Sequence, residues 1–294
     1  MMVLAVYLPV HGQDSTPSID DLAEEIVFYS DINYNASLIS TQERIKEKLD
    51  AACVSFLEHP SSYNYEFREN VWVSIKQPED GSFKIYTYRV KDDKYENSYV
   101  GFLQLKDGTF FRLSDMSAEM EDVEYDALDP DYWYGALYYH ISTIQDNQNQ
   151  PVYLLYGYDE VDEFTNRKVL ETLTFTDGKA SFGKSIIKYN IQEGQRDDIK
   201  SRLILEYSSD AQVSLNYDHS LGMIVYDNLI QRMGQLPGQG PTQYPDGSYR
   251  GLKWDEGMLV YVDKLYHQVS DQAPRPQPVL GNKAKKDIFG KSKN

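Results

Sequence analysis

Apolar residues near the start of the chain recur at helical spacing in two segments. The first segment reads PSIDDLAEEIVFYS, and its apolar face comprises Ile19, Leu22, Ala23, Ile26 and Val27. The second reads STQERIKEKLDAACVSFLEHP, with a stripe that begins at Ile45 and a stop at Pro60. A short helix normally buries such a stripe in its own domain, so we expect both stripes to face the core rather than a partner.

Beyond residue 69 the apolar residues alternate with polar ones, which is the period of a β-strand. The alternating runs flank short turn sequences, several of them Asp-Gly. We expect turns at residues 79–81, 107–108, 159–166, 177–178, 208–210, 218–219 and 255–257. This spacing predicts about eleven or twelve strands in an antiparallel meander, arranged as a sandwich, barrel or roll.

Two segments interrupt the alternation. Residues 116–135, MSAEMEDVEYDALDPDYWYG, are acidic and aromatic, and we expect a helical turn followed by a loop. Residues 231–251, QRMGQLPGQGPTQYPDGSYRG, are rich in Gly, Pro and Gln, and we expect a long loop there. Long loops inside a compact domain are either functional or mobile.

The resulting fold class is α+β and mainly antiparallel β, with two N-terminal helices followed by a sandwich- or barrel-like domain. Composition suggests a signal-peptide remnant at residues 1–17 and a helical segment at residues 18–66. The β-rich domain is expected at residues 67–270, with a sub-boundary near 115–133. Residues 271–294 form a Pro-rich linker and a basic tail.

Charge narrows the range of partners. The 294 residues include 29 Lys and Arg against 46 Asp and Glu, a formal net charge of −17 with a pI near 4.7. A chain this acidic repels nucleic acid, so we expect no nucleic-acid partner. The 25 tyrosines are spread along the chain and suit half-buried strand positions, with stacking on sugar rings as the alternative. Cys53 is the only cysteine and lies among apolar residues, which indicates a buried, inert thiol.

The first residues, MMVLAVYLPVHGQDSTPS, contain an apolar run of the length of a signal-peptide core, too short to cross a bilayer. The basic region that normally precedes such a core is missing, and a buried N-terminal strand is the alternative interpretation. We favour export, to the periplasm or the inner face of the outer membrane. No other window reaches the apolar length of a membrane helix, so we expect no transmembrane segment.

Local signatures of catalysis are missing from the sequence. The five histidines form no HExxH or other metal-ligand spacing, and the chain contains no G-x-S-x-G, P-loop or G-x-G-x-x-G. We therefore name no catalytic residue and favour a non-enzymatic protein. A pair of distant carboxylates, as in glycosidases, needs no local motif and remains an alternative.

Two acidic stretches are candidate binding sites. Calcium prefers oxygen ligands, and DEVDEFTN offers them at Asp159, Asp162, Glu163 and Asn166. Hairpin turns are polar by default, so we favour a turn and expect no cofactor other than calcium. Carboxylates beside aromatic rings suit glycans, and EYDALDPDYWYG combines them at Asp129, Asp131, Tyr132, Trp133 and Tyr134. An ordinary strand edge is the alternative interpretation.

The tail has the opposite charge to the rest of the chain. SDQAPRPQPVLGNKAKKDIFGKSKN carries five lysines from residue 283 onward, opposed only by Asp287. A solvated terminus is one interpretation, and a peptide that docks on a partner is the other. The residues proposed to contact that partner are Lys283, Lys285, Lys286, Ile288, Phe289 and Lys291.

Several short motifs occur in a familiar order: YLLYGYDEVDEFTNRKVLETLTF, then LEYS, SLNYD and IVYDNL. Together they resemble an uncharacterised group of exported, β-rich envelope proteins of Bacteroidota, over roughly residues 134–267. That group typically has LLGWDGN at the first turn, whereas this chain has LLYGYDEVDEFTN. The resemblance implies export and a β-rich fold and supplies no activity. A hairpin tip that differs this much favours a turn over a fixed metal site.

These patterns lead to two functional hypotheses. The first is a non-enzymatic exported protein that acts as an accessory or scaffold subunit of a periplasmic or outer-membrane complex and binds an envelope protein. The alternative is a carbohydrate- or cell-wall-binding β-protein, or a glycoside hydrolase, that uses the segment around Trp133.

Overall fold

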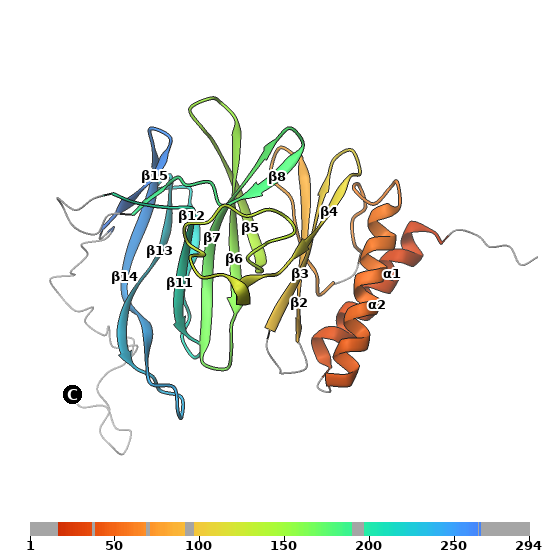
Figure 1. The fold of residues 1–294 in the computed structure, drawn as a ribbon, viewed down its shortest axis with the longest axis horizontal. Helices are drawn as coiled ribbons and strands as arrows, with labels where there is room; N and C mark the ends of the chain where they lie inside the picture. The colour runs from red at the N-terminus through yellow and green to blue at the C-terminus, as the bar shows by residue number, and fades with distance from the viewer. Residues whose placement is uncertain are drawn as a thin grey trace, which may run out of the picture.

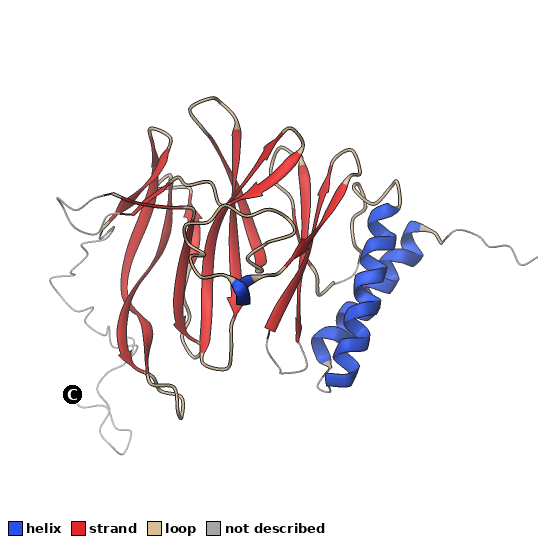
Figure 2. Ribbon diagram, viewed as in Figure 1, coloured by secondary structure: helices blue, strands red, loops and turns tan. Residues whose placement is uncertain are grey.

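The helices and sheets stack in four layers (Figure 1). The computed structural model describes residues 17–36, 39–68, 71–91, 97–189, 197–263 and 265. Two helices form one outer layer, and three sheets follow it (Figure 2). This arrangement confirms the α+β class with N-terminal helices and a mainly antiparallel β-domain. The predicted signal-peptide remnant, except Pro17, and the predicted linker and tail lie outside the described residues.

The helical layer consists of α1 (Ile19–Asn35) and α2 (Ile39–Glu58). The first sheet contains, in spatial order, β1 (Ser74–Lys76), β2 (Phe83–Lys91), β3 (Asn97–Leu105) and β4 (Phe110–Ser114). The second contains β11 (Arg202–Ser208), β7 (Thr165–Thr176), β6 (Pro151–Glu160) and β5 (Leu137–Gln145), with β8 (Lys179–Phe182) paired to β7. The third contains β10 (Asp198–Lys200), β9 (Ile187–Tyr189), β15 (Met258–Val262), β14 (Pro241–Asp255), β13 (Met223–Met233) and β12 (Leu215–Asp218).

The helices form where the apolar spacing predicts them. Ser18 caps α1: its hydroxyl accepts the Asp21 N–H at 3.2 Å, and the Asp21 carboxylate accepts the Ser18 N–H at 2.9 Å. Leu22 on α1 is buried, as are Leu49 and Phe56 on α2, in a core shared with the first sheet. Both stripes therefore face the core, as expected.

The described residues form fifteen strands, more than the eleven or twelve expected. Three of them, β1, β9 and β10, are only three residues long, which is too short to display an alternating pattern. The strand β9 also runs parallel to β15, with the Leu259 N–H bonded to the Ile186 carbonyl at 2.7 Å. Such a pairing, between strands distant in sequence, leaves no local signal.

The prediction of a long loop over residues 231–251 is wrong. The strands β13 and β14 continue through most of it as a two-stranded ribbon, and only residues 234–240 form the connection. The two prolines stand where a strand tolerates them: Pro241 opens β14, and Pro245 pairs with Leu229 beside a register shift. The Gly- and Pro-rich composition therefore reflects a bulged, solvent-facing ribbon.

A connecting segment, residues 115–136, crosses from the first sheet to the second. It contains one 3-10 turn, Ser117–Glu119, followed by irregular chain, as expected from its sequence. Trp133 near its end is fully buried, and the Trp133 indole N–H donates to the Tyr138 hydroxyl at 2.7 Å. The Tyr138 hydroxyl in turn donates to the Glu171 carboxylate.

Glu171 forms a fully buried ion pair with Arg202, which joins β7 to β11. The Arg202 Nε donates to Glu171 Oε1 at 2.6 Å, and Arg202 Nη1 donates to the Val123 carbonyl in the connecting segment. A buried charge needs such partners because its desolvation is costly. The pair therefore ties the connecting segment to the second sheet.

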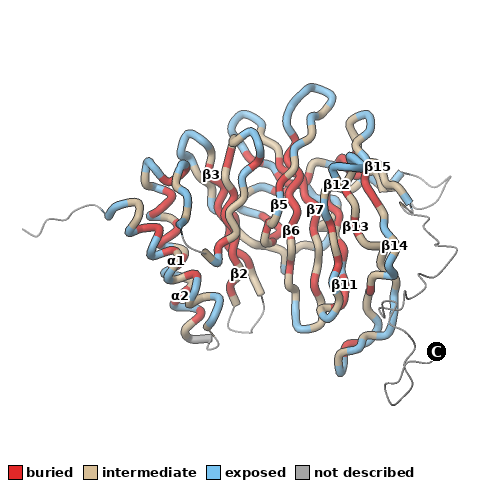
Figure 3. The backbone as a smooth tube through the Cα atoms, turned by 180° about the vertical axis from the view of Figure 1, so that it is seen from behind, coloured by how far each residue is buried: buried red, intermediate tan, exposed pale blue. Residues whose placement is uncertain are grey.

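Burial follows the layers (Figure 3). The largest core, between the first and second sheets, includes Phe83, Leu103 and Leu155, while a second, between the second and third sheets, includes Leu154 and Leu215. Within the described residues, no helix has both the length and the apolar character needed to cross a membrane.

Replacing Arg202 by Met should destabilise the fold by about 3–5 kcal/mol, because Glu171 then remains buried without its counter-charge. Adding Glu171→Met should recover part of that loss, so that the double variant is more stable than the sum of the single variants predicts. Urea unfolding of the four proteins measures this coupling. Additive losses would contradict a coupled pair.

Candidate docking groove

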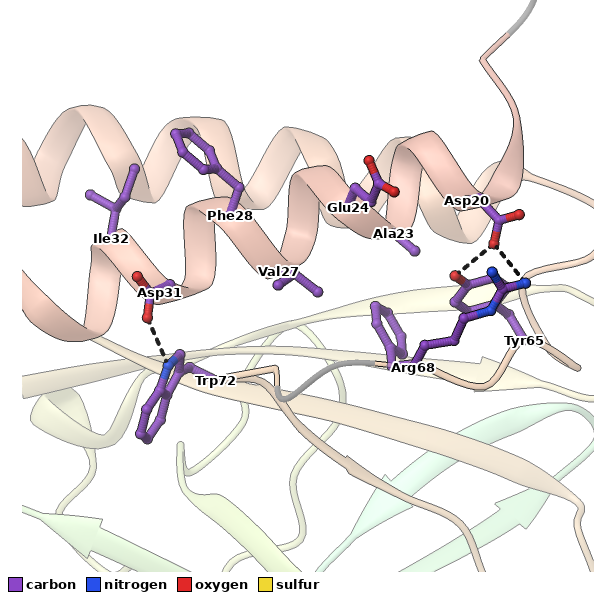
Figure 4. A pocket seen from close by; sticks show the side chains of 11 residues that line it. Asp20, Ala23, Glu24, Val27, Phe28, Asp31, Ile32, Tyr65, Arg68 and Trp72 are labelled. Carbon is purple, nitrogen blue, oxygen red and sulfur yellow. Dashed lines mark hydrogen bonds and ion pairs between the residues drawn. The ribbon is translucent and has the colours of Figure 1, made fainter.

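The N-terminal helix leaves an open groove on the helical layer (Figure 4). The groove encloses about 990 Å³ between α1 and residues 65–68 and 72. Its helical wall comprises Asp20, Ala23, Glu24, Val27, Phe28, Asp31 and Ile32, and its other wall comprises Tyr65, Phe67, Arg68 and Trp72. The helical residues recur three and four positions apart, so α1 offers this face in addition to the stripe that packs on the core.

Polar contacts tie the two walls together at both ends of the groove. At one end, Tyr65 donates its hydroxyl to Asp20 at 3.0 Å, and Arg68 lies 3.6 Å from the same carboxylate. At the other end, the Trp72 indole N–H donates to Asp31 at 3.2 Å (Figure 4). The Trp72 backbone N–H also donates to the buried Ser30 hydroxyl at 3.2 Å. These contacts fix the width of the groove before any ligand binds.

Large apolar side chains are exposed along and beside this groove. Phe28 is 60% exposed and Trp72 is 46% exposed. Tyr34, which is 54% exposed, stacks on Trp72 with ring centroids 3.7 Å apart and the planes nearly parallel. Exposed aromatic rings gathered beside a hollow are typical of an interaction site rather than of an ordinary surface.

The charge of the groove is negative. Its lining includes three carboxylates, Asp20, Glu24 and Asp31, and one guanidinium, Arg68. Burial and the nearby Asp20 raise the pKa of the Tyr65 hydroxyl, which therefore stays neutral and adds no opposing charge. The described lining residues include no histidine, cysteine or serine that could act as a nucleophile or base beside the carboxylates. The arrangement suits binding of an apolar segment that carries positive charge.

The acidic stretch at residues 159–166 forms the turn of the β6–β7 hairpin, as predicted. Asp159 pairs with Arg167 across the two strands, and the Asp162 carboxylate accepts the Phe164 N–H at 2.8 Å within the turn. Asn166 is buried and donates to the Ser209 carbonyl, whereas Glu163 is exposed. Within the described residues, no group of three or more acidic, His or Cys side chains is arranged to hold a metal ion.

Asp159 itself belongs to a buried polar cluster. The Tyr134 hydroxyl donates to Asp159 Oδ2 at 2.9 Å, and the Arg167 guanidinium lies 3.7 Å away. Burial raises the pKa of Asp159 to about 6, despite these partners. Asp115, whose own pKa burial raises, adds a second negative charge in the same region.

The predicted glycan-binding residues separate into buried and exposed groups. Trp133 and Tyr134 are buried, at 0% and 1% exposure, so neither ring has a free face for a sugar. Asp129 accepts the backbone N–H groups of Asp131 and Tyr132 and so shapes a turn. Asp131 and Tyr132 are exposed beside it. The proposed stacking platform thus lacks its two central rings.

Sequence reasoning missed the groove. The predicted partner-contacting residues at 283–291 lie outside the described residues, whereas Phe28 and Trp72 attracted no prediction. One signal was present: Val27 and Phe28 extend the apolar positions of α1 beyond the width of one core stripe. No periodic signal marks Trp72, because it lies in irregular chain.

Replacing Asp159 by Asn should change how stability depends on pH. Folding raises the pKa of Asp159 to about 6, from about 3.9 in an unfolded chain. The folded protein therefore binds this proton more tightly than the unfolded chain does. The wild-type unfolding free energy therefore loses up to about 3 kcal/mol as the pH rises from 4 to 7. Asp159→Asn should escape this loss and become the more stable protein at pH 7.

Urea unfolding at pH 4, 5, 6 and 7 measures the difference. Asp162→Asn is the matched control, because it removes an exposed carboxylate from the same hairpin and should follow the wild-type pH dependence. Parallel curves for wild type and Asp159→Asn would show that Asp159 does not titrate in this range.

The groove and the buried polar cluster around Asp159 are interpreted from their geometry. No protein-family model, curated protein or solved structure matches this chain significantly. The resemblance to exported proteins of Bacteroidota therefore stays a prediction from the sequence.

Proposed function

We propose that this chain is a non-enzymatic, exported envelope protein that acts as an accessory or scaffold subunit. It binds a partner by holding an apolar, positively charged segment in the groove between α1 and residues 65–68 and 72. Export rests on the sequence of the first residues, and the binding role rests on the groove. The layered sheets serve as the rigid support for that surface.

The exposed aromatic rings along the groove carry the proposal. Phe28 and Trp72 expose large apolar rings to solvent, and both lie beside carboxylates. Exposed apolar patches of this kind mark interaction sites. Aromatic residues in the centre of an interface often supply most of its binding free energy. The surrounding carboxylates then select for lysine or arginine on the partner and against acidic segments.

Affinity purification from envelope extract should recover a stoichiometric partner with the wild-type chain and lose it with Phe28→Ala or Trp72→Ala. Each aromatic anchor contributes roughly 1.5–3 kcal/mol, so retention should fall by about tenfold or more. Phe28 is largely exposed, so its replacement should leave the melting temperature unchanged. Met233→Ala is the matched control, because Met233 is 71% exposed on β13 in the outermost sheet.

A competition experiment tests the chemistry of the partner. A short peptide that combines leucine and phenylalanine with lysines should displace the partner, and the same peptide with glutamates in place of lysines should not. Retention that survives both groove variants and the basic peptide would overturn the proposal.

A further inference from the structure

We propose that the lysine-rich segment at residues 283–293 of this same chain occupies the groove between α1 and residues 65–68 and 72. This inference rests on the proposed function, because it names the occupant of the same site. The basic tail would then bind the groove of its own molecule before it meets any other protein. An external partner would then have to displace the tail or bind it.

Charge and apolar character match on the two sides. The segment KAKKDIFGKSK carries five lysines and one aspartate around the apolar pair Ile288 and Phe289. The groove presents three carboxylates and one guanidinium around Val27 and Phe28. The basic segment thus has the opposite charge to the groove and to a chain whose net charge is −17.

The spacing of the charges also agrees. Asp20 and Asp31 are eleven residues apart on α1, which is about 16 Å along a helix axis. Lys286 and Lys291 are five residues apart, which is also about 16 Å in an extended chain. Ile288 and Phe289 lie between those lysines. An extended segment along α1 thus places its apolar pair between the ends of the groove, where Val27 points toward the opposite wall (Figure 4).

The chain between Leu265 and the lysine-rich segment is long enough for that segment to reach the groove. Leu265 lies on the third sheet, where its N–H donates to the Tyr249 carbonyl at 3.1 Å. The third sheet and the helical layer are the two outermost layers (Figure 1). Packed layers are spaced about 10 Å apart, so roughly 30 Å separates them. Twenty residues stand between Leu265 and Lys286, and a chain of that length extends to about 70 Å.

The tether favours the same chain over a second copy. A tether that spans its two sites gives an effective local concentration on the order of millimolar. A second molecule would need a comparable bulk concentration to compete. At micromolar protein, the intramolecular contact therefore dominates.

Disulfide trapping in the full-length chain tests the contact. The variant Glu24→Cys with Ile288→Cys places one thiol in the groove and one in the segment. Glu25→Cys with Ile288→Cys is the matched control, because Glu25 is exposed on α1 and does not line the groove. The native Cys53 does not interfere, since it is buried and burial raises the pKa of its thiol.

We expect an intramolecular cross-link, seen as a faster band on a non-reducing gel, that forms roughly tenfold faster in the Glu24 variant than in the Glu25 variant. Its rate should not depend on protein concentration, and adding Phe289→Ala should slow it. Melting temperatures in reducing buffer confirm that all variants fold.

Two results would overturn the inference. Equal rates in the Glu24 and Glu25 variants would show that the tail has no preference for the groove. A dimeric cross-link whose rate rises with protein concentration would identify a second copy as the occupant. Either result leaves the proposed function intact, provided that partner capture still depends on Phe28 and Trp72.

Discussion

The buried ion pair between Glu171 and Arg202 is the interaction on which the central layers depend. It joins β7 to β11, and through Arg202 it also holds the Val123 carbonyl of the connecting segment. The hydroxyl of Tyr138 and the indole of Trp133 extend the same network toward the first sheet. Because these buried groups partner one another, loss of one member leaves its partner unsatisfied. The network thus fixes the position of a segment that has almost no regular secondary structure.

The helical layer is organised differently. Its core face is apolar, and polar contacts also join α1 to the chain that carries Tyr65 and Trp72: Asp20 makes them at one end, and Ser30 and Asp31 make them at the other. Phe28 lies between these contacts along the helix and remains exposed. A rigid stack of sheets behind a partly open helix gives a surface whose shape exists before binding, which lowers the conformational cost of an interaction.

Local sequence patterns predicted the helices and most of the strands. Contacts between residues distant in sequence determine how these elements pair and pack. The capping by Ser18 and the stop at Pro60 act within one helical turn, so the sequence could indicate both helices. The ribbon of β13 and β14 was hidden because Pro241 and Pro245 resemble loop residues until their strand partners are known. The groove was also hidden: Phe28 and Trp72 are 44 residues apart, and no single-sequence pattern brings them together. Tyr134 and Asp159 likewise meet only through the packing of β6 against the connecting segment.

The parallel pairing of β9 with β15 has a consequence for synthesis of the chain. The partner of Ile187 is Leu259, about seventy residues later, whereas the strand pairing of the first sheet and its packing on the helices lie within residues 19–114. During translation, both helices and all four strands of the first sheet leave the ribosome before β15 does. The apolar face of the second sheet must therefore wait, uncovered, for the third sheet to emerge. The nascent chain is thus most in need of chaperone protection late in its synthesis.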